Sequence, residues 1–231
     1  MTSDELLDEL RAMANLANVD GMARFGISVE GTLGISILVL RQTAKRVGRD
    51  HALAIDLWAS GIHEARILAS MIDDPAAVTP EQMDSWAADF DSWDVCDQVC
   101  GNLFDCTPHA FDKVAEWSTR DEEYVRRAAF SLLAALTVHD KRATDDQFLA
   151  CFPLIVSAAT DERNFVKKAV NWSLRQIGKR NPSLNAQAIQ LARDIQQLDS
   201  RSARWIAADA LRELTSEPVQ ERLKRAGARS L

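Results

Sequence analysis

Trp93 and Asp97 are the two residues whose types and spacing point most directly to chemistry. They stand four positions apart, so in a helix they lie on the same face. An indole ring attracts a cation through its π face, and a carboxylate supplies the opposite charge. A helix through this segment would therefore present a receptor for a positively charged group.

Trp172 is a second candidate, because it follows the basic segment 164–168 by about one turn. If both helices face the same concavity, Trp93, Asp97 and Trp172 make an aromatic and acidic cleft with a basic rim. The residues alone also fit a structural role, since tryptophans usually anchor a core and an aspartate near a helix start often caps it. For the remaining tryptophans we expect the core, and these are Trp58, Trp86, Trp117 and Trp205.

The four cysteines do not have the spacing of a metal site. Cys96 and Cys100 share a helical face, but His109 alone is a poor further ligand. We expect reduced, buried or half-buried thiols at these two positions and at Cys106 and Cys151. The glycine-rich segment around Gly26 lacks the spacing of a dinucleotide or phosphate loop, so we predict neither a metal nor a cofactor.

The composition predicts that helices position these residues. Among 231 residues there are 9 glycines, 6 prolines and a single tyrosine, while 47% are hydrophobic. Alanine, leucine, arginine and glutamine favour helices, and sheets favour the aromatic and β-branched residues that are scarce here. We expect one all-α domain over residues 1–231.

A repeat of about 40 residues organises the chain. The segments 125–129, 166–170 and 203–207 align, and each continues to a leucine four residues on, at Leu133, Leu174 and Leu211. This period with two helices per unit is typical of HEAT or armadillo-like repeats, which stack into a solenoid. The acidic stretches 121–123 and 161–164 are expected to cap the helices that follow them.

The same repeat places basic residues at equivalent points. Arg126 and Arg127 align with Lys167 and Lys168, so stacking is expected to produce a basic stripe. The whole chain has a net charge of −7, which alone disfavours a nucleic-acid binder. Residues 1–160 have a net charge of −13, however, and residues 161–231 have +6. Residues 73–123 have −12, and we expect that segment to lie away from any DNA groove, except for Asp97.

The sequence has no recognisable secretory signal, and its apolar runs are shorter than the roughly 18 residues of a membrane span. We therefore expect a cytoplasmic protein that does not bind membranes.

Several motifs in order resemble the AlkD-like DNA alkylation repair family of HEAT-like repeat glycosylases. They cover residues 25–214 and comprise Leu57-Trp58, His63–Arg66, Trp93–Asp97, Tyr124–Phe130, Asn164–Arg175 and Lys179–Pro182. The resemblance implies an α-α superhelix of HEAT-like repeats. It also implies a monofunctional glycosylase that removes positively charged N3- and N7-alkylated purines from double-stranded DNA, as a monomer.

The resemblance also assigns roles to residues. Asp97 matches the family's essential aspartate, Trp93 and Trp172 match its cleft tryptophans, and Arg127 matches an arginine of the repeat helix. Further basic residues would then bind the DNA backbone, and these are Arg126, Lys167, Lys168, Arg175, Lys179 and Arg180. The family's N-terminal tyrosine has no clear counterpart, and Phe25 is the nearest aromatic residue.

Two other functions remain open at this stage. A non-enzymatic HEAT-like module would bind DNA or a protein partner without releasing a base. A purely structural scaffold would show no salt-sensitive binding of nucleic acid at all.

Overall fold

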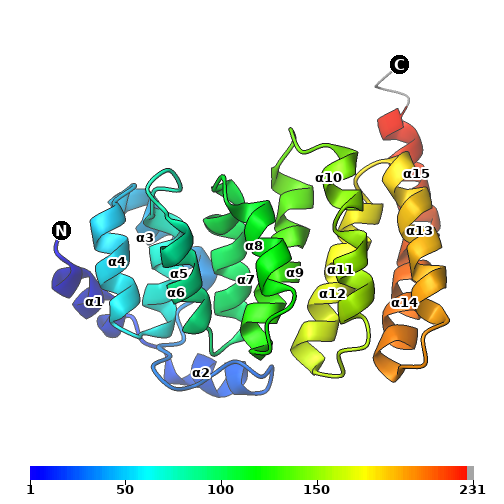
Figure 1. Cartoon of the computed structure of the whole chain (residues 1–231). Coiled ribbons are helices and arrows are strands. Elements are labelled where there is room, and N and C mark those ends of the chain that lie inside the picture. The colour runs from blue at the N-terminus through cyan, green and yellow to red at the C-terminus, as the bar shows by residue number, and fades with distance from the viewer. Residues whose placement is uncertain (228–231) are drawn as a thin grey trace. The chain divides into compact units, whose positions relative to one another are not determined.

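The computed structural model describes residues 1–227, and the chain divides into two compact units, Met1–His109 and Ala110–Leu231. All regular elements within residues 1–227 are helices (Figure 1). The single domain expected over residues 1–231 stays a prediction.

Unit 1 contains seven α-helices and one short 3₁₀ helix in its described sequence. They are α1 (Ser3–Ala12), α2 (Leu16–Ala23), α3 (Ile37–Val47), α4 (His51–Ala59), α5 (His63–Ile72), α6 (Pro80–Ala88), α7 (Trp93–Asn102) and η1 (Phe104–Cys106). Helix α5 lies at the centre, because it packs against α1, α3, α4 and α7. Most of its side chains are buried, which suits a helix that is covered on several sides.

Unit 2 continues the chain with eight helices between residues 110 and 227. They are α8 (Ala110–Trp117), α9 (Glu123–His139), α10 (Asp145–Leu149), α11 (Phe152–Ala158), α12 (Asn164–Gly178), α13 (Pro182–Gln196), α14 (Arg201–Leu214) and α15 (Glu217–Gly227). The helices α9, α12 and α14 lie side by side in that order, and α8, α11 and α13 pack against them (Figure 1).

The three segments that align in the sequence fall on α9, α12 and α14, so the repeat is confirmed in unit 2. Their apolar positions are buried in the same register, for example Val125, Val166 and Ala203 at the start of each segment. Apolar residues at this helical spacing bury one face of each helix against its neighbours. The sequence pattern therefore identified the face that holds the stack together.

The core contains three of the four tryptophans expected there. Trp58, Trp86 and Trp117 are buried, and the rings of Trp58 and Trp86 stack with their centroids 4.0 Å apart. The expectation was wrong for Trp205, whose side chain is 41% exposed. Among the cysteines, Cys106 is exposed, whereas Cys96, Cys100 and Cys151 are buried as expected.

The expected acidic caps of α9 and α12 do not form. The residues before these helices are Glu122 and Arg163, and neither side chain makes a capping hydrogen bond. Glu162 instead accepts hydrogen bonds from the backbone N–H of Ser202 and the hydroxyl of Ser200, at 3.0 and 3.1 Å. This carboxylate therefore satisfies the start of α14, one repeat later, where free N–H groups need an acceptor.

Within the part of the chain that the structure describes, no helix has both the length and the apolar character needed to cross a membrane.

Candidate functional site

Helix α7 places Trp93 and Asp97 on its first and second turns, and both side chains are half-buried. The indole N–H of Trp93 donates a hydrogen bond to the backbone carbonyl of Phe25 at 3.0 Å. This bond joins residues that are 68 positions apart and fixes the edge of the indole ring. Phe25 itself is 73% exposed, so its side chain lies in solvent while its backbone carbonyl holds the indole of Trp93.

Glu64 fixes the loop that follows Phe25. Its buried carboxylate accepts three backbone N–H groups, from Leu33, Gly34 and Ile35, at 2.8, 2.6 and 3.1 Å. A carboxylate that accepts several backbone N–H groups makes strong, charge-assisted hydrogen bonds. Helix α5 thereby holds this loop, and the loop leads back to the residues that contact Trp93.

Asp94 takes part in a buried polar cluster at the start of α7. It accepts a hydrogen bond from the hydroxyl of Ser92 at 2.5 Å, and its other oxygen lies 2.9 Å from Nε2 of His63. Burial lowers the pKa of His63, but the hydrogen bond and charge of Asp94 outweigh it, so the pKa of His63 is raised. Burial likewise raises the pKa of Asp94, and the bond to His63 outweighs it, so that pKa is lowered. The pair is therefore held as an ion pair that joins α5 to α7.

Helix α12 of unit 2 presents Trp172 on a polar face. Lys168, Trp172 and Arg175 recur at positions i, i+4 and i+7, so they share one face of the helix. Trp172 and Arg175 are half-buried and Lys168 is exposed. An indole flanked by cations on one helix suits contact with a sugar and its neighbouring phosphates.

Arg126 and Arg127 point into unit 2 rather than forming a free basic stripe. Arg127 is only 5% exposed and donates to the backbone carbonyl of Phe165 on α12 at 2.7 Å. Arg126 donates to the carbonyl of Ser118 at 2.9 Å and pairs with Asp161 at 3.1 Å. Both arginines thus tie α9 to its neighbours.

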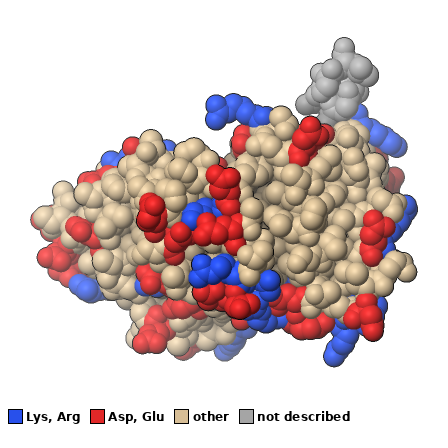
Figure 2. Space-filling model, in the orientation of Figure 1, with Lys and Arg blue, Asp and Glu red and all other residues tan. Residues whose placement is uncertain are grey.

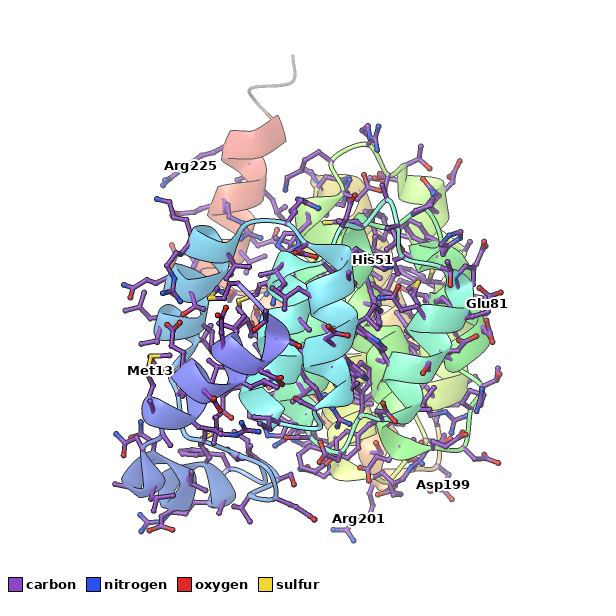
Figure 3. The ribbon with its side chains drawn as sticks, turned by 90° about the vertical axis from the view of Figure 1, so that its left-hand side faces the viewer. Met13, His51, Glu81, Asp199, Arg201 and Arg225 are labelled. Carbon is purple, nitrogen blue, oxygen red and sulfur yellow. The ribbon has the colours of Figure 1, made fainter. Side chains whose placement is uncertain are left out.

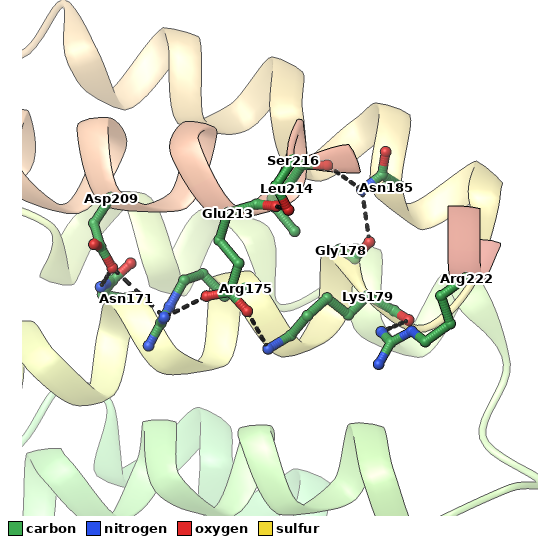
Figure 4. Close-up of polar contacts among 10 residues, drawn as sticks. All are labelled: Asn171, Arg175, Gly178, Lys179, Asn185, Asp209, Glu213, Leu214, Ser216 and Arg222. Carbon is green, nitrogen blue, oxygen red and sulfur yellow. Dashed lines mark hydrogen bonds and ion pairs between the residues drawn. The ribbon is translucent and has the colours of Figure 1, made fainter. Parts of the chain in front are cut away.

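The basic residues at the end of α12 pair with carboxylates of α14 (Figure 4). Glu213 accepts from Arg175, and its other oxygen lies 2.6 Å from Nζ of Lys179. Burial raises the pKa of Glu213, but the hydrogen bond of Lys179 and the charge of Arg175 outweigh it, and the pKa is lowered. Asp209 adds a second partner, 3.6 Å from Arg175.

The remaining expected DNA ligands differ in their surroundings. Arg180 donates to three backbone carbonyls, those of Thr137, Asp140 and Ala143, at 2.7, 2.8 and 2.9 Å. The ammonium of Lys167 lies 5.4 Å from the ring centre of Trp205. Lys168 has no carboxylate partner among the described residues.

The expected site residues belong to two units with different charge. Trp93 and Asp97 lie in unit 1, whereas Trp172, Arg127 and the six expected DNA-backbone ligands lie in unit 2. Unit 1 has 7 basic and 18 acidic side chains, a net charge of −11; unit 2 has 20 and 16, a net charge of +4. Figure 2 shows acidic and basic side chains interspersed on the face in view. The candidate reacting aspartate is thus in the acidic unit and the candidate phosphate ligands are in the basic one.

Among the described residues, no three histidine, cysteine or carboxylate side chains are grouped closely enough to hold a metal ion. Burial raises the pKa of the Cys100 thiol well above its ordinary value, and the neighbouring Cys96 raises it further. The Cys100 thiol is therefore a protonated packing group.

A family model described as "DNA alkylation repair enzyme" matches residues 6–214. The chain belongs to this family. A comparison with curated proteins finds no match.

A solved structure confirms the fold. It is described as "a new family of proteins related to the HEAT-like repeat DNA glycosylases with affinity for branched DNA structures". It matches with a TM-score of 0.78 and 18% identity, covering 96% of each chain. The all-α, HEAT-like helical-repeat fold expected from the sequence is therefore confirmed.

Two engineered proteins match far less well. One is described only as an engineered protein, at a TM-score of 0.39 and 14% identity, covering 76% of this chain and 90% of its own. The other is a designed armadillo repeat protein in complex with a (KR)4 peptide. Its TM-score is 0.38 and its identity 13%, and the match covers 82% of this chain and 80% of the designed protein. These likenesses are too weak to support an argument.

Two features of this family member were not predicted from its sequence. The His63–Asp94 pair was not found, because the partners are 31 residues apart and neither stands in a recognised catalytic motif. A core position was expected for Trp205, yet the repeat itself indicates that this position is exposed. In the alignment Trp205 stands where the exposed Lys168 stands one repeat earlier.

Proposed function

We propose that this protein is a DNA glycosylase that removes positively charged N3- and N7-alkylated purines. The observation that supports it most is the pair on α7, where an indole is held by the Phe25 carbonyl and the carboxylate of Asp97 follows one turn later. This pair occurs in a chain that belongs to the DNA alkylation repair enzyme family.

The chemistry of the substrate suits such a pair. An alkylated purine carries a positive charge, so the bond from its nitrogen to the deoxyribose breaks with the electron pair going to the base, which leaves neutral. Positive charge then develops on the sugar, and a carboxylate stabilises an oxocarbenium-like centre as it does in glycoside hydrolysis. A water molecule positioned by Asp97 adds to the sugar carbon, and its proton passes to the solvent.

The other residues have binding roles in this proposal. Each of Trp93 and Trp172 contacts a deoxyribose or a base through its ring face. Arg127, which donates to the Phe165 carbonyl, holds α9 against α12 and so keeps the helix of Trp172 in place. Lys168 is the expected phosphate ligand with no carboxylate to displace among the described residues, whereas Arg175 and Lys179 would have to share their charge with Glu213.

The substitution Asp97→Asn tests the proposed chemistry. We expect release of 7-methylguanine from methylated duplex DNA to slow by about 100-fold or more, because one preorganised electrostatic group is lost. Binding of undamaged duplex and the unfolding temperature should stay near the wild-type values. Asp91→Asn is the matched control, since Asp91 is exposed just before α7 and loses the same charge. Wild-type release by the Asp97 variant would contradict the assignment.

A second function, DNA binding without catalysis, is favoured by the related protein described as having affinity for branched DNA structures. It predicts salt-sensitive binding of undamaged duplex and branched DNA by the wild-type protein, with no base released from methylated DNA. Measuring both activities on one preparation separates the two functions.

A further inference from the structure

A basic cavity lies at the far end of α12 from Lys168, entirely within unit 2. Its volume is about 590 Å³, within the range of ordinary ligand pockets. It is formed by the ends of α9 and α12, the 140–144 turn and α15. Its charged lining residues are Lys141, Lys179, Arg180, Arg222 and Asp145.

Three of the four cations are bound to backbone carbonyls rather than to carboxylates. Arg180 donates to three carbonyls around the 140–144 turn. Lys141 donates to the carbonyl of Val138, and Arg222 donates to the carbonyl of Lys179 at 2.8 Å (Figure 4). Lys179 is the exception, since Glu213 balances its charge.

The cavity keeps a positive charge after its neighbours are counted. The C-termini of α9 and α12 carry about half a negative charge each, which offsets one cation. Asp145 offsets a second, and it is also held by the amide of Asn181 at 2.8 Å. The three cations without a carboxylate partner are thus offset by about two negative charges. About one positive charge remains in the cavity, which matches the single negative charge of a phosphodiester.

The side chains at the mouth have hydrogen-bond donors to spare. Lys141 and Arg222 are exposed, and each side chain makes a single hydrogen bond within the part of the chain that the structure describes. An ammonium has three N–H groups and a guanidinium has five, so both side chains can reach a second acceptor. The fork of a guanidinium also fits two oxygens of one phosphate.

We propose that this cavity binds a phosphodiester group of a nucleic-acid strand, as a second anchor apart from the Lys168–Trp172 face of α12. The volume leaves room for the sugar beside the phosphate. The inference rests on the DNA-binding part of the proposed function and does not depend on base excision.

The test uses the double variant Lys141→Gln, Arg222→Gln. Its matched control is Arg142→Gln, Lys224→Gln, which removes the same charge from the same turn and the same helix. Arg142 and Lys224 are exposed and do not line the cavity. Because all four side chains are on the surface, both variants should unfold within a few degrees of the wild type.

Binding of a fluorescent, undamaged duplex is measured by anisotropy at several salt concentrations. We expect the cavity variant to bind about fivefold more weakly, with the slope of log Kd against log salt reduced by about one. The control variant should keep more of the affinity for duplex and more of the salt slope. Equal losses in the two variants would show a general effect of charge and overturn the inference.

Inorganic phosphate is the second probe, followed through the rise of the unfolding temperature on binding. A rise lost only in the cavity variant, together with unchanged duplex binding, would mean a site for free phosphate and would overturn the phosphodiester assignment. If the wild-type protein binds no duplex, the proposed function fails first. If it binds duplex and the cavity variant binds equally well, only this inference fails.

Discussion

At the scale of single residues, the bond from the Trp93 indole to the Phe25 carbonyl bears most on the candidate site. It joins the backbone of the N-terminal segment to the tryptophan of α7. The sequence indicated Phe25 only as the nearest replacement for a missing tyrosine. Spacing along the chain does not predict a contact between residues 68 positions apart, so only the tertiary structure reveals that Phe25 contacts Trp93.

The His63–Asp94 ion pair makes stability depend on pH. The pKa of His63 is raised above its ordinary 6.5, so its contribution is complete below that pH and is lost as pH rises through the raised value. The pKa of Asp94 is lowered below its ordinary 3.8, so its contribution is present above 3.8 and is lost as pH falls through the lowered value. The pair therefore stabilises the fold most between about pH 4 and 6.5.

The substitution Asp94→Asn measures this dependence. We expect the difference in free energy of unfolding between wild type and variant to be largest near pH 5 and smaller at pH 9, in urea titrations. The hydrogen bond from Ser92 adds a part that does not vary with pH. Asp112→Asn, an exposed change in unit 2, should give a nearly constant difference. A constant difference for Asp94→Asn would show that His63 is neutral in the fold.

At the scale of elements, Gly34 decides whether the loop before α3 can reach its place. Its φ angle is +76°, and a Cβ atom there would lie 2.2 Å from the backbone oxygen of Asn15. Its N–H donates to Glu64 and its carbonyl accepts from the Asn18 side chain at 2.9 Å. Only glycine combines this backbone conformation with so close an approach.

The substitution Gly34→Ala should therefore destabilise the protein by about 2 kcal/mol or more, since it adds left-handed strain to a clash with backbone. Gly21→Ala in α2 is the control, because nothing lies within 4 Å of its added Cβ. Urea unfolding gives both values. The tryptophan fluorescence of the Gly34 variant should also differ from that of the wild type, because the loop positions the Phe25 carbonyl at the Trp93 indole. An effect no larger than that of Gly21→Ala would contradict this account of the loop.

The helical stack was predictable from sequence, and its polar connections were not. The register of α9, α12 and α14 followed from apolar positions that recur every 37 to 41 residues, because each helix must bury the same face. The capping interpretation of Glu162 failed because its side chain reaches Ser202 in the next repeat rather than its own helix. A long side chain near a turn has several partners within reach, and packing between repeats selects among them.

At the scale of the whole molecule, charge is divided along the chain. A net charge of −7 disfavours contact with DNA, but units 1 and 2 have −11 and +4. Several cations of unit 2 are already paired with carboxylates, for example Arg126 with Asp161 and Arg175 with Glu213. Exposed cations at the ends of elements, such as Arg225 projecting from α15 in Figure 3, add to the positive field of unit 2. Affinity for DNA should therefore depend on a few cations that have no carboxylate partner.

Lys168 is the clearest example of a cation that has no carboxylate partner among the described residues. Lys168→Gln should weaken binding of undamaged duplex several-fold and reduce the salt slope by about one, because one phosphate contact and its released counterion are lost. Arg193→Gln on α13 removes one exposed charge from the other helix of the pair and should change neither quantity. Arg175→Gln should act mainly on stability, since it leaves Asp209 and Glu213 with one partner fewer. If Arg175 and Lys168 affect the salt slope equally, the carboxylates of α14 do not withhold Arg175 from DNA, and the pairing in Figure 4 is exchanged for phosphate on binding.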